Sequence, residues 1–328
     1  MKKSQEEERK GFTRRDFLRV SAGTAGVVAL GSLPALASAE KSGGPASDDV
    51  VDELLRGAID THIHTGPDVN PRTLSDIGVA QAAKTAGMKA VITKCHVTST
   101  VSRAILAQEA VGKGILVFGG LVLNKAEGGL NVEGVATEIK IGAKEIWLPT
   151  FWSESHIAFD KKNPADAVKI TDDKGAFRPE LIEIFDLIAK KDIILGTGHT
   201  TCAEMERFIP LAKQRGVKRI LITHPEWSLP DMSIEVQKKL VRYGVFFERC
   251  AQSLYPPPNR HITPQDYVNQ IRATGVECST LATDLGQVYN PRPVEGYRHL
   301  IKSLLADGIS PKEIEIMAQK NPAQVLGV

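Results

Sequence analysis

Hydrophobic residues alternate between two patterns along residues 51–328. Short runs rich in aliphatic and β-branched residues are typical of buried strands, and the amphipathic stretches between them are typical of helices. Eight such runs occur: Ala58–Ile63, Lys89–Thr93, Ile115–Leu123, Glu145–Leu148, Asp192–Leu195, Arg219–Thr223, Val245–Phe247 and Glu277–Ala282. Eight strands, each followed by a helix, predict an α/β fold consisting of a single (β/α)8 TIM barrel. A doubly wound sheet is the alternative, but no G-x-G-x-x-G segment follows the first run.

Local signals support the predicted helices. The stretch Ser75–Ala86 ends before Gly87, a residue type that commonly follows a helix. Thr263 and Ser310 each precede a proline and are expected to cap the helices that follow, Ser310 with Glu313 as a capping box.

One long loop interrupts the alternation after the fourth run. Residues 149–177 contain His156 and a hairpin-like turn at Asp172–Gly175. Because loops of this length are usually functional or disordered, we expect a partial lid over the barrel mouth. A surface hairpin without function is the alternative.

The N-terminus resembles a twin-arginine export signal. Thr13–Leu18 contains Arg14 and Arg15, an apolar run follows, and Ala37–Ala39 form an A-x-A cleavage site. A retained membrane anchor is the alternative, although the run is short and contains Pro34. The resemblance implies a signal peptide at 1–39, cleavage after Ala39 and export by the twin-arginine machinery to the periplasm or the cell exterior. Residues 40–50 are expected to be a linker before the barrel domain at 51–328.

Charge and cysteine content narrow the class of partner. The whole chain has a net charge of +2, but residues 1–39 contain seven basic and four acidic residues, so the remainder is nearly neutral. A nucleic-acid partner is therefore not expected, and a small-molecule substrate is. The sequence is compatible with a homo-oligomer. Four cysteines without paired metal-type spacing are expected in the core: Cys95, Cys202, Cys250 and Cys278.

Histidines collect where predicted strands end. Five of the eight lie at or just after a strand end: His62, His64, His96, His199 and His224. Because the active sites of these barrels form at the carboxyl ends of the strands, these side chains are expected to meet. Of the other three, His156 lies in the long loop, and His261 and His299 are expected to be peripheral.

The first run carries an H-x-H pair. Strand side chains alternate, so His62 and His64 are expected on one face, where both imidazoles can bind one metal ion. Asp60 shares that parity and is expected to orient a histidine. Asp284 follows the eighth strand, which closes the barrel beside the first. Its carboxylate is expected to bind the metal and to accept a proton from bound water, whereas an N-cap role is the alternative.

These residues together resemble the amidohydrolase superfamily of metal-dependent barrel hydrolases, and Asn321–Gly327 is similar to its closing N-P-A-x-x-L-G segment. The resemblance implies His62 and His64 on the more buried metal, and His199 and His224 on a second metal or as polarising groups. It further implies Asp284 as ligand and proton shuttle. For a hydrolase of this kind, His224 or His96 is expected to stabilise the developing oxyanion. One or two divalent ions, most simply zinc, are the implied cofactor.

The chain departs from that family at the fourth strand, where the bridging carboxylated lysine is missing. Lys94, at the end of the second run, is the candidate substitute, either as a carbamate bridging two metals or as an unmodified amine. Cys95 is a further candidate. If nothing bridges, the site holds one metal.

Substrate contacts are expected from residues after strand ends, above all from cationic groups that suit a carboxylate or phosphate. The candidates are Arg72, His96, Arg249 and Arg292, with Glu226, Glu248 and Tyr289 as additional ones. Three functions follow: a metal-dependent hydrolase acting on an amide, ester or related bond, a mononuclear decarboxylase or isomerase, and an exported metal- or ligand-binding protein without catalysis.

Overall fold

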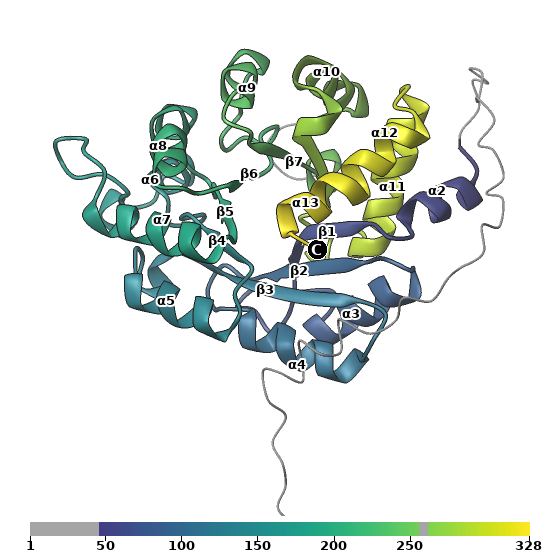
Figure 1. The fold of residues 1–328 in the computed structure, drawn as a ribbon, viewed down its shortest axis with the longest axis horizontal. Coiled ribbons are helices and arrows are strands. Elements are labelled where there is room, and N and C mark those ends of the chain that lie inside the picture. Colours follow the sequence, from purple (N-terminus) through teal and green to yellow (C-terminus); the bar gives the residue numbers. More distant parts are fainter. Residues whose placement is uncertain (1–45, 256–261) are drawn as a thin grey trace, which may run out of the picture. The chain divides into compact units, whose positions relative to one another are not determined.

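The computed structural model describes residues 46–255 and 262–328 as an eight-stranded, nearly closed barrel. All strands are parallel and lie in chain order around it (Figure 1). They are β1 Ile59–His64, β2 Ala90–Lys94, β3 Leu116–Val122, β4 Glu145–Trp147, β5 Ile194–Gly196, β6 Arg219–Ile222, β7 Phe246–Cys250 and β8 Ser279–Ala282. Each corresponds to a run predicted from the hydrophobic pattern. The predicted export signal and His261 lie outside the described residues.

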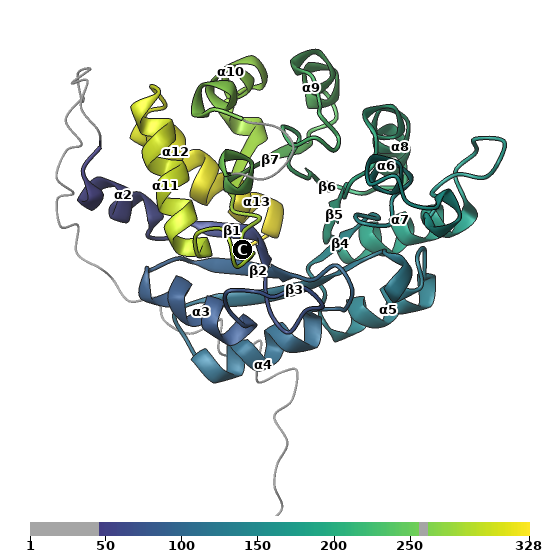
Figure 2. The same cartoon turned by 180° about the vertical axis from the view of Figure 1, so that it is seen from behind.

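The helices follow the strands, so the predicted (β/α)8 TIM barrel is confirmed. In Figures 1 and 2, α3 to α5 lie at one edge of the molecule and α8 to α10 at the opposite edge. Among the described residues, no helix is long and apolar enough to cross a bilayer. The helices are α2 Asp48–Leu55, α3 Asp76–Thr85, α4 Val101–Val111, α5 Val132–Ile141, α6 Glu154–Phe159, α7 Pro179–Lys191, α8 Cys202–Gln214, α9 Ile234–Val241, α10 Pro264–Thr274, α11 Pro293–Ala306, α12 Pro311–Glu315 and α13 Asn321–Leu326.

Capping side chains begin several helices, and the sequence predicted two of them, Thr263 and Ser310. Ser75 accepts a hydrogen bond from the backbone N–H of Gly78. Thr263 starts α10 and Ser310 starts α12, both with a complete capping box. The predicted linker is too long, because α2 already begins at Asp48 after Ser47, with two acidic residues favourably placed in its first turn.

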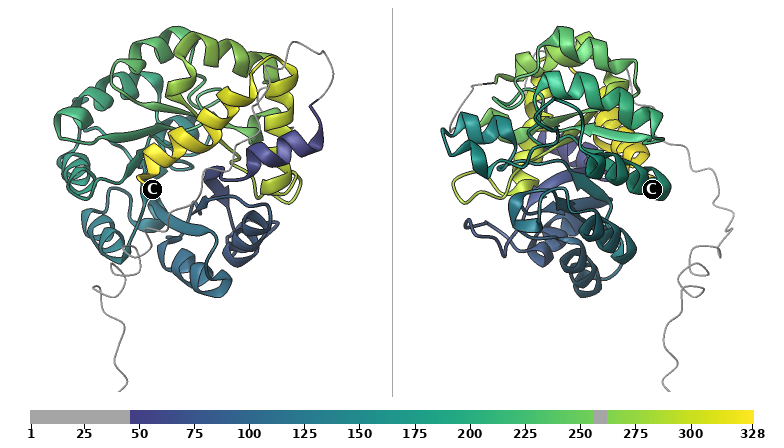
Figure 3. Two further views of the ribbon diagram at one scale, coloured as in Figure 1. Left: turned by 45° about the vertical axis from the view of Figure 1, so that its right-hand side comes forward. Right: turned by 90° about the vertical axis from the view of Figure 1, so that its left-hand side faces the viewer.

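The amino ends of the strands are closed by α13. Its Val325 and Leu326 pack against apolar side chains inside the barrel, including Ile59. The amide of Asn321 donates hydrogen bonds of 2.7 Å to the carbonyl oxygens of Val276 and Ser279, just before and at the start of β8. Figure 3, left, shows the C-terminal helices crossing this region. The opposite, carboxyl end of the barrel is therefore the end left available for a site.

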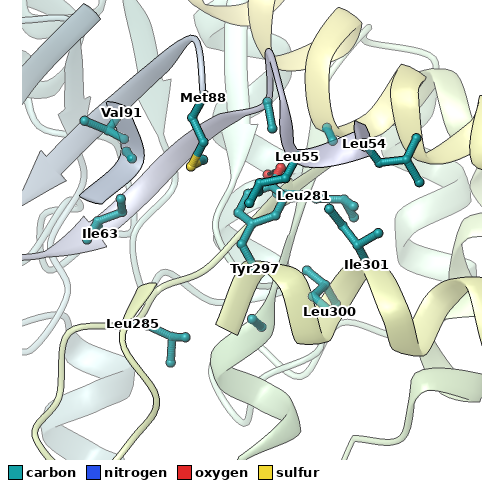
Figure 4. Close-up of a cluster of buried hydrophobic side chains, with 14 of the residues drawn as sticks. Leu54, Leu55, Ile63, Met88, Val91, Leu281, Leu285, Tyr297, Leu300 and Ile301 are labelled. Atoms are coloured by element: carbon teal, nitrogen blue, oxygen red, sulfur yellow. Dashed lines mark hydrogen bonds between the residues drawn. The ribbon is translucent and has the colours of Figure 1, made fainter. Parts of the chain in front are cut away.

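The seam between β8 and β1 is held by Tyr297 on α11, which lies within a buried apolar cluster (Figure 4). Its hydroxyl lies 3.0 Å from the carbonyl oxygen of Leu281 on β8 and 3.3 Å from that of Ile59 on β1. Further along, the N–H of Asp284 donates to the carbonyl oxygen of His62, at 2.7 Å. The seam therefore sets where the residues after β8 lie relative to β1.

Candidate metal centre

An extra residue in β1 determines which side chains enter the barrel. Ile59 and Asp60 pair with Ala90 and Val91, but Ile63 and His64 pair with Thr93 and Lys94, so β1 has one residue more than β2 between these pairs. Such a bulge shifts the alternation of side chains.

The expectation for Asp60 is wrong because of this bulge. Asp60 accepts hydrogen bonds from the backbone N–H and hydroxyl of Thr283, at 3.0 and 2.7 Å, and from the N–H of His62. It therefore fastens the end of β8 to β1 rather than orienting an imidazole. Burial raises the pKa of Asp60 to about 7, although these hydrogen bonds oppose the rise.

Two histidines and a carboxylate meet just beyond the seam. Nε2 of His62 lies 3.0 Å and Nε2 of His64 lies 2.9 Å from Oδ1 of Asp284. All three residues are buried, and their ligand atoms lie within 4.8 Å of one another. Asp284 has a φ of 53°, in the left-handed region that non-glycine residues seldom adopt. The strained backbone turns its carboxylate back toward β1.

Glu248 on β7 orients His62, a role that the sequence interpretation missed. Its carboxylate accepts hydrogen bonds from Nδ1 of His62 at 2.9 Å and from the hydroxyl of Thr61 at 2.6 Å. Proton placement on Nδ1 leaves the Nε2 lone pair of His62 available to a metal ion. Glu248 is fully buried and does not line the mouth, so its predicted substrate contact is wrong. Its position on β7, facing into the barrel, was the available signal.

Lys94 reaches the same point from β2. Its Nζ lies 3.0 Å from Nε2 of His62 and 5.1 Å from the ring centroid of Trp147, which occupies the end of β4. Burial lowers the pKa of Lys94, while nearby carboxylates oppose this. Cys95 is buried but does not line the cavity. Cys250 forms a second candidate donor set with His62 and Glu248. Glu248 already accepts a hydrogen bond from His62, and neither Cys250 nor Glu248 lines the cavity.

The histidines that follow β5 and β6 face each other across the cavity. Nε2 of His199 lies 3.3 Å from Nε2 of His224, whose backbone also has a positive φ of 27°. Burial lowers the pKa of His224 to about 4 and that of His64 to about 3, and it lowers the pKa of His199 well below its usual value. These imidazoles are therefore neutral near pH 7, the state in which a ring nitrogen binds a metal.

The donor set fits a divalent metal. Two imidazole nitrogens and one carboxylate oxygen lie close together, which is the ligand chemistry of zinc. Nδ1 of His64 and Nδ1 of His224 are buried without a hydrogen-bond partner, so these two nitrogens gain no compensation from the surrounding protein. A shared cation would compensate for several of these desolvated groups at once.

The cavity above the histidines has a volume of about 460 Å³. A second cavity, of about 490 Å³, lies between α3 and α11. The long loop contributes one wall of the cavity above the histidines through Phe151, His156 and Phe159, consistent with the expected partial lid. Its hairpin-like turn is confirmed by the antiparallel bridge between Thr171 and Phe177.

The predicted substrate residues divide into two groups. Arg72, His96 and Tyr289 line the cavity above the histidines, and Arg72 is held there by an ion pair of 2.8 Å with Asp68. His96 is hydrogen bonded to Thr150 through Nδ1, at 2.8 Å.

Besides Glu248, three predicted contacts do not reach this cavity. Arg249 points away from the barrel interior and pairs with Glu226 and Gln237, because adjacent residues of β7 face opposite sides. Glu226 is accordingly buried against Arg249. Arg292 precedes α11 and lines the other cavity. The predicted peripheral position of His299 is consistent with its contact to Tyr255.

Gly286 permits the approach of β8 to β1. A Cβ at this position would lie 1.9 Å from the carbonyl oxygen of His64, and its φ is 134°. Gly286→Ala is therefore expected to lower the free energy of unfolding by about 1–3 kcal/mol and to weaken metal binding. Urea unfolding and metal analysis measure both effects. Gly142→Ala is the matched control, because Gly142 has a φ of 135° and open space around it; equal effects of the two substitutions would contradict the role of the close approach.

Comparison with known proteins gives a family and a fold. A model described as a family of unknown function (DUF6282) matches residues 57–248, and no curated protein matches the sequence. An amidohydrolase from Pseudomonas aeruginosa is similar in structure, with 12% identity, a TM-score of 0.57 and coverage of 86% of this chain and 98% of the other.

Two further solved structures have the same fold. Organophosphorus hydrolase from Deinococcus radiodurans has 17% identity and a TM-score of 0.53, with 84% of this chain and 94% of the other covered. A structure described as organophosphate hydrolysis activity engineered from a lactonase template has 17% identity and a TM-score of 0.54, with 82% and 95% covered. At these identities the comparisons show the shared barrel.

Proposed function

Since the chain belongs to the family DUF6282, whose function is unknown, we propose from its own site that it is a metal-dependent hydrolase acting on an amide, ester or related bond of a small molecule. The convergence of His62, His64 and Asp284 is the observation that carries this proposal, because His64 and Asp284 also line a cavity. The descriptions of the amidohydrolase and the organophosphorus hydrolase with similar folds are consistent with it.

A divalent ion, for which zinc is proposed, would lower the pKa of a bound water toward about 7 and polarise the scissile group. Asp284 accepts the proton of the attacking water and passes it to the leaving group. His224 and His96 stand at the cavity wall, where a donated N–H stabilises negative charge developing on the substrate. Arg72 provides a cation at the mouth for an anionic substrate group.

The direct test is metal analysis of the full-length protein and of a His62→Ala/His64→Ala variant. We expect one or two equivalents of zinc in the parent and a loss of at least one in the variant, because two of the converging ligands are removed. Hydrolysis of 4-nitrophenyl esters and phosphotriesters, measured in parallel, should disappear with the metal. A parent that binds no metal after zinc or manganese supplementation would overturn the proposal.

The number of metal ions depends on whether Lys94 acts as a bridging ligand. Its amine adjoins the ligand nitrogen of His62 and lines the same cavity as His199 and His224. We propose a carbamylated Lys94 bridging two metals, so Lys94→Ala should lower the metal content from two equivalents to about one. Unchanged stoichiometry would leave Lys94 as an unmodified amine facing the substrate.

A mononuclear decarboxylase or isomerase is the second candidate, and the observation that favours it is the position of Trp147 at the end of β4. That strand end offers no bridging lysine. One metal equivalent together with carbon dioxide release from carboxylated aromatic compounds would favour this candidate. A binding protein without catalysis is the least supported candidate, because the proposed proton shuttle, Asp284, is present beside His62.

We also propose that the protein works outside the cytoplasm after export by the twin-arginine pathway. The support is the Thr13–Leu18 motif with Ala37–Ala39.

A further inference from the structure

The lid contacts one of the candidate metal ligands directly. His156 on α6 lies with its Nδ1 2.7 Å from Nδ1 of His199, and the two rings are stacked with centroids 4.8 Å apart. The neighbouring Ser155 donates its hydroxyl hydrogen to the carbonyl oxygen of His199. His156 is buried, with 6% of its surface exposed. Both the ring and the backbone of His199 are therefore held by one short segment of residues 149–177.

The contact between two ring nitrogens restricts where the protons lie. One nitrogen has to donate and the other has to accept, because a neutral imidazole has one N–H and one lone pair. If Nε2 of His199 binds a metal, its Nδ1 carries the proton. Nδ1 of His156 is then the acceptor, and Nε2 of His156 carries a proton toward Oδ2 of Asp160, 3.5 Å away. In this arrangement of protons, each contact from Asp160 through His156 to His199 joins one donor to one acceptor.

We propose that His156 is a positioning residue that fixes the tautomer of His199, so that closure of the lid and metal binding beside β5 and β6 favour each other. The inference rests on the proposed metal-dependent function. It gives residues 149–177 a role beyond covering the cavity, because displacement of α6 would remove the group that accepts the Nδ1 proton of His199. In return, a metal on Nε2 of His199 would favour the closed position of α6.

The test uses Co²⁺ as the probe in the full-length protein. Its affinity is measured by competition with a chelator, and its visible absorption spectrum reports the ligand geometry. His156→Phe keeps an aromatic ring against His199 but removes the acceptor, so we expect about 10–100-fold weaker Co²⁺ binding and an altered spectrum. His156→Asn restores an acceptor oxygen near the position of Nδ1 and should recover most of the affinity. Glu154→Gln, at an exposed position of the same helix, should behave as the parent.

Limited trypsin cleavage tests whether metal binding in turn favours the closed position of α6. Lys161 and Lys162, directly after α6, offer exposed cleavage sites. Co²⁺ should slow cleavage there several-fold in the parent and much less in His156→Phe.

Three outcomes would overturn the inference. They are a His156→Phe variant with the affinity and spectrum of the parent, a Glu154→Gln variant impaired to the same degree, and equal protection from trypsin in parent and variant. If the parent binds no Co²⁺, the proposed metal-dependent function fails together with this inference. The three outcomes above overturn the inference alone.

Discussion

Asp284→Asn is expected to lower kcat/KM for metal-dependent hydrolysis by about 10²–10⁴-fold. Oδ1 of Asp284 lies within 3.0 Å of Nε2 of both His62 and His64, so its carboxylate is placed both to bind the metal and to accept the proton of the attacking water. An amide keeps the shape and one oxygen, but it does not take up a proton near neutral pH. The measurement is the rate of hydrolysis, with metal content determined on the same samples.

Asp166→Asn is the matched control for Asp284. Asp166 is an exposed carboxylate in the lid segment, paired with Lys125, and its replacement should leave the rate unchanged. An Asp284→Asn variant that retains both its metal and most of its rate would contradict the proton-shuttle role. Loss of the metal together with the rate would instead assign Asp284 chiefly as a ligand.

Arg249→Met is expected to destabilise the protein by about 3–5 kcal/mol. The guanidinium of Arg249 and the carboxylate of Glu226 are both fully buried, and Arg249 also contacts Gln237, Gln270 and Thr274. Removing only the cation leaves the negative charge of Glu226 uncompensated inside the protein. Thermal unfolding should show a fall in Tm of about 5–8 °C.

A substitution of Glu226, the ion-pair partner of Arg249, separates the effect of charge on stability from the effect of packing. Glu226→Gln combined with Arg249→Met should recover a large part of the lost stability, because no isolated charge remains. Arg178→Met, at an exposed ion pair with Glu180, should produce no measurable change. If the double variant were no more stable than Arg249→Met alone, packing of the arginine stem rather than charge pairing would account for the loss.

Several elements of the site were predictable from local signals. The eight apolar runs and the caps at Thr263 and Ser310 depend on neighbouring residues only, so pattern and capping rules identified them. The H-x-H pair and Asp284 were placed correctly because barrel closure brings the ends of β1 and β8 together whatever the detailed packing. The roles proposed for these residues await the tests above.

Other positions depended on features with no local pattern. The bulge in β1 moved Asp60 off the face that strict alternation assigned to it. Adjacent residues of β7 face opposite sides of the strand, so Glu248 contacts His62 and Arg249 faces the surrounding helices. Arg292 lay beside a different cavity because it precedes α11.

The sequence by itself determined the barrel, the starts of α10 and α12, and the histidines and carboxylate at the strand ends. Periodicity, capping and strand order act over short distances or follow from closure. Only the tertiary structure decided which side of each strand a group faces, that Glu248 orients His62, and that His156 from the lid reaches His199. Those contacts join residues 43 to 186 positions apart, and strand register and loop path, which bring such residues together, leave no periodic trace in the chain.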